Sequence, residues 1–112
     1  MEVNFRGSEQ QVVRELYSIF PVGTSKNEVL LIAKSKLKLG ESKLKSHDYG
    51  EHPLVLKEDE KEIYVYSWVE INIAEYRSIK RMFIKTTVVA KLFFDESEKL
   101  NGIEVKIYGD SL

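Results

Sequence analysis

The chain has 112 residues, of which 43% are hydrophobic and 31% are charged, and its formal net charge is -1 at pH 7. This length predicts a single domain, residues 1–112, that can bury a hydrophobic core. The balance of charge argues against nucleic-acid binding, which usually comes with a marked basic excess. Because the sequence contains no cysteine, disulfides, thiolate metal sites and cysteine nucleophiles are excluded.

A first helix is predicted over residues 8–19, after an N-terminal tail of residues 1–7. Ser8 and Gln11 have the spacing of a capping box, in which each side chain bonds to the backbone N–H of the other residue. Pro21 ends the helix, because proline disfavours helical geometry in the residue before it. The apolar residues at helical spacing are Val12, Val13, Leu16, Ile19 and Phe20.

A second helix follows at once, so a helical pair is predicted over residues 8–39. Ser25 and Glu28 form another S-x-x-E capping pattern, and Gly23 supplies the backbone freedom for the joint between the helices. Gly40 is predicted to lie just past the end of the second helix. The apolar stripe of this helix is Val29, Ile32, Ala33 and Leu37.

Residues 41–53 are polar and predict a loop, and an antiparallel sheet is predicted over residues 54–108. The expected strands are residues 54–56, 62–72, 82–94 and 103–108. An acidic run at 58–62 predicts an exposed turn, residues 74–81 predict a polar connection, and Asn101-Gly102 is expected to close the last turn. Two helices followed by strands predict an α+β fold, with two N-terminal helices packed on one face of an antiparallel sheet of about four strands.

The alternation of side chains predicts which face of each strand is buried. In residues 62–72, one face carries Ile63, Val65, Val69 and Ile71, and the other carries Tyr64, Tyr66 and Trp68. In residues 82–94, one face carries Met82, Ile84, Val88, Ala90, Leu92 and Phe94, and the other carries Phe83, Lys85, Thr87, Val89, Lys91 and Phe93. In the last strand, Ile103, Val105 and Ile107 are expected to point inward.

Three segments in this order, FPVGTSKNEV, IYVYSW and VVAKLFFDESEKLNGIEVKI, carry a family resemblance. The matching residues are Gly23, Thr24, Ser25, Val29, Tyr64, Tyr66, Trp68, Phe94, Asp95, Gly102, Ile103 and Val105. Roughly from residue 12 to 108, the chain resembles the SmpA/OmlA family of small envelope lipoproteins. The resemblance implies the helix-helix-sheet layout of the β-lactamase inhibitor protein repeats, binding of other proteins through the sheet or its loops, and no catalytic activity. The family's lipid-attachment cysteine and export signal are not in this sequence.

The expected contact surface combines the aromatic row with the acidic turn. Two short helices can cover only one face of a sheet, so an apolar second face must lie against a loop, a second subunit or a partner. Tyrosine and tryptophan are favoured at interfaces because they combine a large contact area with a polar tip. The candidate partner-binding residues are Tyr64, Tyr66, Trp68, Phe83, Phe93, Glu58, Asp59 and Glu60. The alternative is that residues 41–57 fold over the sheet and bury this row.

Metal binding and catalysis have less support in the sequence. The segment SHDYGEH holds four possible zinc ligands, which are His47, Asp48, Glu51 and His52. Their spacing matches no rigid metal-binding pattern, and polar loops often gather such residues by chance. No catalytic residue, no metal and no cofactor are therefore expected.

The sequence predicts a small bacterial protein-binding module of the SmpA/OmlA-like type, not an enzyme, and a monomer or weak homodimer without nucleic acid or a membrane span. The alternative is a cytoplasmic immunity protein that neutralises a cognate toxin, such as a nuclease, by occluding its active site. The expected location is the cytoplasm if Met1 is the native start. It is the periplasm or the outer membrane if an export segment was removed.

Overall fold

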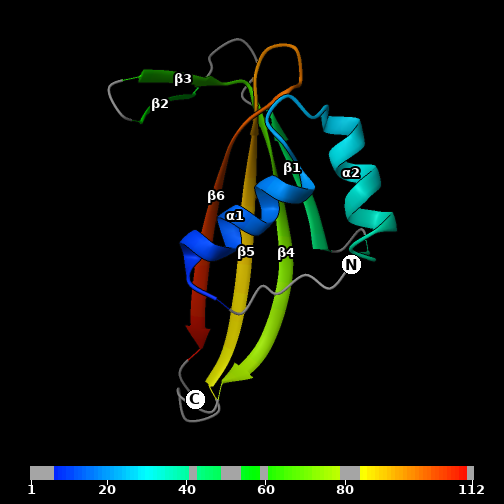
Figure 1. Cartoon of the computed structure of the whole chain (residues 1–112), viewed down its shortest axis with the longest axis vertical. Helices are drawn as coiled ribbons and strands as arrows, with labels where there is room; N and C mark the ends of the chain where they lie inside the picture. The colour runs from blue at the N-terminus through cyan, green and yellow to red at the C-terminus, as the bar shows by residue number, and fades with distance from the viewer. Residues whose placement is uncertain (1–6, 41–42, 49–53, 59–60, 79–83, 111–112) are drawn as a thin grey trace.

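The structure, a computed structural model, describes residues 7–40, 43–48, 54–58, 61–78 and 84–110. Its elements are α1 (Glu9–Ile19), α2 (Lys26–Ser35), β1 (Leu44–Asp48), β2 (Leu54–Glu58), β3 (Lys61–Val65), β4 (Ser67–Ser78), β5 (Ile84–Phe94) and β6 (Leu100–Asp110). Four strands form an antiparallel sheet in the order β1-β4-β5-β6, and β2 and β3 form a separate two-stranded sheet (Figure 1). The predicted α+β class, with two N-terminal helices and a four-stranded antiparallel sheet, is confirmed.

Both helices begin at the predicted caps. The Ser8 hydroxyl accepts from the Gln11 backbone N–H at 3.2 Å, and Gln11 Oε1 accepts from the Ser8 N–H at 2.8 Å, which completes the capping box. The Ser25 hydroxyl accepts from the Glu28 N–H at 3.2 Å. These bonds satisfy N–H groups that have no partner inside a helix. The starts of both helices are therefore local features of the sequence.

The end of α2 differs from the prediction. The helix stops at Ser35, and the residue in the left-handed conformation is Lys38, with a φ of 54°, and not Gly40. The Leu39 N–H donates to the Ala33 carbonyl at 3.0 Å and turns the chain back over the last helical turn. This bond requires the left-handed residue one position before Leu39, so the glycine that follows has no part in ending the helix.

The joint between the helices is attached to the start of β6. Gly23 has a φ of 94°, which favours glycine. The Gly23 N–H donates to the Leu100 carbonyl at 2.9 Å, and the Leu100 N–H donates to the Thr24 carbonyl at 2.8 Å. The Lys26 N–H donates to the Glu98 carbonyl at 2.9 Å. The joint therefore pairs like a short strand with the beginning of β6, and it fixes both helices against the sheet.

The segment predicted as a loop at 41–53 contains a strand. β1 pairs with β4 from Leu44 opposite Ile71 to Asp48 opposite Ser67. β1 lies at the edge of the sheet, and its residues after Leu44 are exposed. A strand that contributes one apolar side chain to the core has no alternating apolar pattern, so the sequence did not predict it.

The strand predicted over residues 62–72 is divided at Tyr66. β3 pairs with β2 from Leu54 opposite Val65 to Glu58 opposite Lys61, whereas β4 belongs to the large sheet. The Tyr66 N–H donates to the Phe94 carbonyl at 2.9 Å at this division. Because buried residues still alternate across it, at Val65 and Ser67, the sequence pattern does not mark the break. β4 also continues to Ser78 and includes most of the expected polar connection.

The turn between β5 and β6 lies earlier than predicted. The Asp95 carboxylate accepts from the backbone N–H groups of Ser97 and Lys99, both at 2.9 Å, and Glu98 has a φ of 58°. Asn101 and Gly102 lie within β6, where a register shift places Gly102 opposite Phe93. Because Asp95 satisfies the N–H groups of this turn, the chain reverses before it reaches Asn101 and Gly102.

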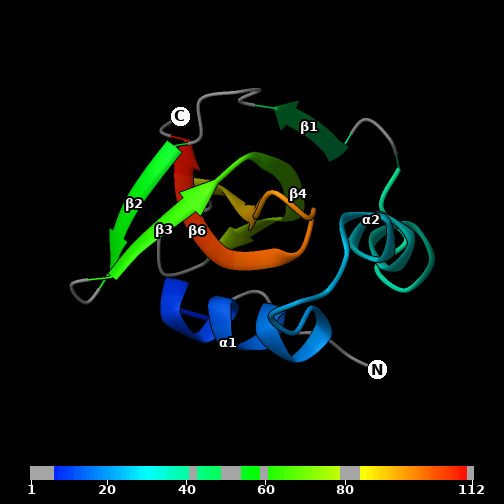
Figure 2. The same cartoon turned by 90° about the horizontal axis from the view of Figure 1, so that it is seen from above.

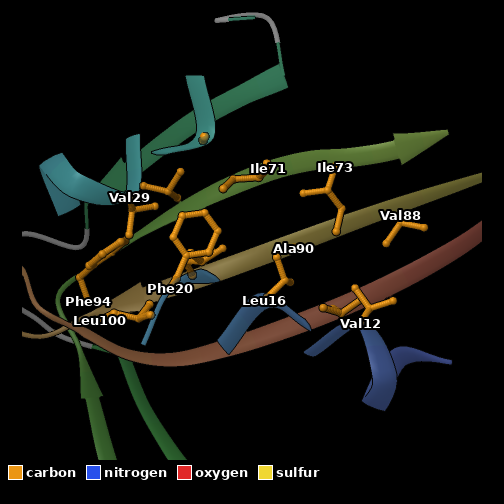
Figure 3. Close-up of a cluster of buried hydrophobic side chains, with 14 residues drawn as sticks. Val12, Leu16, Phe20, Val29, Ile71, Ile73, Val88, Ala90, Phe94 and Leu100 are labelled. Atoms are coloured by element: carbon orange, nitrogen blue, oxygen red, sulfur yellow. The ribbon is translucent and has the colours of Figure 1, made fainter. Parts of the chain in front are cut away.

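The hydrophobic core lies between the two helices and one face of the large sheet (Figures 2 and 3). Its buried residues are Val12, Leu16, Phe20, Val29, Ala33, Val69, Ile71, Ile73, Val88, Ala90, Leu92, Phe94, Leu100 and Val105. The predicted inward residues Val69, Ile71, Val88, Ala90, Leu92, Phe94 and Val105 are buried in this core, and Ile103 and Ile107 are partly buried against it. Val65 is buried outside this core, and Ile63 is only partly buried, because both lie on β3. Met82 and Phe83 lie outside the described residues. Within the described part of the chain, no helix is long and apolar enough to span a bilayer.

Candidate binding surface

The face of the large sheet opposite the helices, hereafter the outer face, carries one row of aromatic side chains. Side chains of cross-strand partners lie on the same face of a sheet. His47 is opposite Trp68, Trp68 is opposite Phe93, and Phe93 is opposite Gly102. This aromatic row therefore spans β1, β4 and β5, and the position next to it on β6 is a glycine.

Trp68 is held by side chains from both neighbouring strands. The His47 ring is stacked on the Trp68 ring, with centroids 3.9 Å apart and planes 17° apart. The Lys91 Nζ lies 4.9 Å from the centroid of the Trp68 ring, within the range of a cation–π interaction. Trp68 itself is partly buried. The indole is therefore held in place from β1 and β5 while part of it remains open to solvent.

A second row beside the aromatic one consists of charged side chains of alternating sign. Lys45 is opposite Glu70, Glu70 is opposite Lys91, and Lys91 is opposite Glu104. Opposite charges that face each other on adjacent strands stabilise a sheet by about 0.2–1 kcal/mol per pair. The outer face therefore combines an aromatic row with a charged row that has no net charge, in contrast to the basic groove that binds single-stranded nucleic acid.

A groove of about 780 Å³ adjoins the β6 end of the aromatic row. It lies between α1, the β2–β3 hairpin and β6, and its apolar lining includes Val13, Leu56, Ile63 and Phe93. The charged residues at the groove are Glu9, Arg14, Lys57 and Glu104, so their formal charges cancel. Its volume lies within the usual range of about 300–1,000 Å³ for ligand pockets.

The β2–β3 hairpin carries an exposed tyrosine away from the aromatic row. Tyr64 is 48% exposed, and its hydroxyl donates to Glu62 Oε2 at 2.9 Å. This hydrogen bond raises the pKa of the Tyr64 hydroxyl above its ordinary value of 10.0, and the negative charge of Glu62 adds to the effect. The Asn101 side chain donates to the Tyr64 carbonyl at 3.0 Å and connects the hairpin to β6.

The structure brings together only part of the predicted partner-binding set. Trp68 and Phe93 are direct cross-strand neighbours, although Phe93 is only 6% exposed. Tyr66 lies at the junction of the two sheets and is partly buried, and Tyr64 lies on the hairpin. Glu58 is the last residue of β2. Phe83, Asp59 and Glu60 lie outside the described residues.

Of the four predicted metal ligands, two lie among the described residues. His47 lies in β1 and stacks on Trp68, and Asp48 follows it in the strand, where successive side chains point to opposite faces. Glu51 and His52 lie outside the described residues. Among the residues that are described, no group of three or more histidine, aspartate or glutamate side chains could hold a metal ion.

Sequence reasoning missed three residues of this surface. Lys91 and Gly102 contact the aromatic row only because of the pairing of β5 with β4 and β6. Tyr108, which is 53% exposed, lies further along β6. The alternation of inward and outward side chains can be read from the sequence of each strand, and it assigns these residues to a face. The sequence did not contain the register, which decides their neighbours.

No protein-family model matches the chain, and no curated protein or solved structure shows significant similarity to it.

Proposed function

We propose that this chain is a non-catalytic protein-binding domain of the SmpA/OmlA-like type, and that its contact surface is the outer face around Trp68. The observation that carries the proposal is the arrangement of Trp68. A large aromatic side chain lies between contacts from His47 and Lys91, yet it remains partly open on a sheet face that neither helix covers. A rigid aromatic anchor loses little conformational freedom on binding, which is why tryptophan is enriched at interface hot spots.

The charged row beside Trp68 supports a protein as the partner. The row of Lys45, Glu70, Lys91 and Glu104 has an alternating sign, and it offers both donors and acceptors next to an aromatic centre. Protein interfaces commonly combine an aromatic core with a polar rim of this kind. The preferred partner therefore presents an apolar patch beside charged groups of both signs.

The proposal is tested by partner capture followed by a variant at Trp68. The tagged chain is used to isolate binding proteins from native cells, and the affinity of each purified partner is then measured by calorimetry. Trp68→Ala is expected to weaken binding by about 2 kcal/mol or more, which is roughly thirtyfold in the dissociation constant. An envelope protein as the partner supports the SmpA/OmlA-like role, whereas a stoichiometric toxin domain supports an immunity protein.

Two controls separate contact from folding. Leu31→Ala removes an apolar side chain that is 65% exposed on α2, and it should leave the affinity unchanged. Trp68 is the only tryptophan of the chain, so its fluorescence should change when the partner binds and become less accessible to a soluble quencher. A folded Trp68→Ala variant with wild-type affinity, or an unshielded indole in the complex, would contradict the proposal.

A further inference from the structure

β6 is an edge strand, and only part of its outer edge is occupied. In an antiparallel pair, the N–H and C=O of one residue point to the same side, and this side alternates along the strand. The Ile103 N–H donates to the Tyr17 hydroxyl at 3.1 Å, so the backbone N–H and C=O of Ile103 point away from β5. The register with β5 is regular from Ile103 to Asp110. The backbone groups of Val105, Ile107 and Gly109 therefore point to the outer edge as well.

The occupied part of this edge is its beginning. Leu100 pairs with Gly23 and Thr24 of the helix joint, and the Ile103 N–H is bonded to Tyr17. From Val105 to Gly109, nothing in the described part of the chain pairs with the outward backbone groups. A row of unpaired N–H and C=O groups is a template for one further extended strand.

We propose that the strand that completes this edge is β6 of a second copy of the chain, paired antiparallel and centred on Val105. The stretch Ile103-Glu104-Val105-Lys106-Ile107 is complementary to itself in this register. Val105 faces Val105 of the second copy, and the two exchange backbone hydrogen bonds because both point outward. Ile103 faces Ile107 of the second copy, and Glu104 faces Lys106 of the second copy.

The charges favour this register over its neighbours. Glu104 Oε1 and Lys106 Nζ lie 3.9 Å apart within one chain, and their side chains are 44% and 55% exposed. An exposed pair of this kind contributes little to the stability of the single chain. In the dimer, each of the two side chains gains an opposite charge directly across the new strand pair, and this happens twice because of the two-fold symmetry. A shift by two residues would place Glu104 opposite Tyr108, or opposite Glu104 of the second copy.

The same register fills the groove beside β6. Tyr108 of the second copy comes to lie opposite Gly102, on the outer face, next to Phe93. A Cβ at Gly102 would lie 3.4 Å from Phe93 Cδ2, so the Phe93 ring packs directly beside this buried glycine. Leu56 and Ile63 line the same groove and extend the apolar contact.

The two halves of β6 therefore differ in their surroundings. The groove lies beside Gly102 to Val105, and the open edge with the exposed Tyr108 lies beyond Val105. Two-fold pairing about Val105 places the open half of each copy in the groove of the other copy. Tyr17 opposes this pairing, because its hydroxyl occupies the Ile103 N–H that would otherwise bond to the second copy.

The oligomeric state tests the proposal, and it does so without reference to any other partner. Sedimentation equilibrium of the full chain should show a reversible dimer that increases with protein concentration. Lys106→Glu places two acidic side chains opposite each other at both ends of the strand pair, and it should weaken the dimer by about tenfold or more. Glu104→Lys should have the same effect with two basic side chains. Tyr17→Phe should tighten the dimer, because it removes the competing hydroxyl.

A mixture of the two charge variants gives the decisive result. One variant carries acidic side chains at positions 104 and 106 and the other carries basic ones, so an equimolar mixture should form a heterodimer that is tighter than the homodimer of either variant alone. Lys45→Glu makes the same charge change on β1 at the opposite edge, and it should leave the dimer unchanged. A wild-type chain that is monomeric at about 1 mM, or a dimer that resists both charge variants, would overturn the proposal.

Discussion

At the scale of single residues, left-handed backbone conformation is used at three described positions, and only one of them is a glycine. Gly23 has a φ of 94°, whereas Lys38 and Glu98 adopt 54° and 58°. A side chain in this region costs about 1–2 kcal/mol, because its Cβ approaches the following carbonyl. Gly23 is therefore needed for the backbone of the joint between the helices, and no neighbouring atom lies within 4 Å of a Cβ built on it.

Gly23→Ala is expected to lower the free energy of unfolding by about 1 kcal/mol, because alanine is strained at this φ. Gly40→Ala is the matched control, since a Cβ there also meets open space and the backbone is not left-handed. The control should be neutral or stabilising by about 0.5 kcal/mol, because alanine restricts the unfolded chain. Chemical denaturation of both variants measures the difference. Equal effects at the two sites would show that the joint does not require the left-handed glycine.

At the scale of elements, the ends of helices and strands are decided by hydrogen bonds that the sequence pattern does not display. α2 ends at Ser35 because the chain turns back through Lys38, although a glycine is available two residues later. The β5–β6 turn is closed by the Asp95 carboxylate, although Asn101-Gly102 follows. In both cases the residue with the highest turn propensity lies close to the turn but outside it.

Lys38→Gly is expected to raise the free energy of unfolding by about 0.5 kcal/mol, because the relief of left-handed strain exceeds the entropy that a glycine loses on folding. Lys36→Gly changes the same side chain at the C-cap of α2, where the backbone is right-handed with φ -86° and ψ -41°. There the substitution should lower the stability by about 0.5 kcal/mol, because only the entropic cost remains. Thermal melting of the two variants should therefore shift in opposite directions. Shifts of the same sign would contradict this account of the helix end.

At the scale of the whole molecule, the two sheets differ in how firmly they are held. The large sheet has a fully covered face, and β5 is paired on both sides. The hairpin of β2 and β3 projects from one end of the large sheet (Figure 1), and Leu54, Val55 and Tyr64 are exposed on it. Its described attachments are the buried Val65 and the bond from Asn101, whereas Leu56 and Ile63 line the open groove.

Amide hydrogen exchange should separate these two parts of the fold. The amides of β5 are expected to exchange only through global unfolding, because they lie between two paired strands over the core. The amides of the hairpin should exchange faster through local opening, because few buried apolar contacts hold it. Asn101→Ala removes one attachment and should speed exchange in β3 while leaving β5 unchanged. Equal protection of the hairpin and β5 would show instead that the two sheets unfold as one unit.

The sequence by itself determined the class of the fold, the starts of both helices and the buried faces of the strands, because capping and periodicity act between residues that are close in the chain. It also predicted that Trp68 and Phe93 belong to one contact surface. Tertiary structure alone decided that β1 is a strand, that the chain changes sheets at Tyr66, and that His47 and Lys91 hold the indole. These features depend on the register between strands distant in sequence. A register is chosen by the packing of the whole sheet, and no local pattern specifies it.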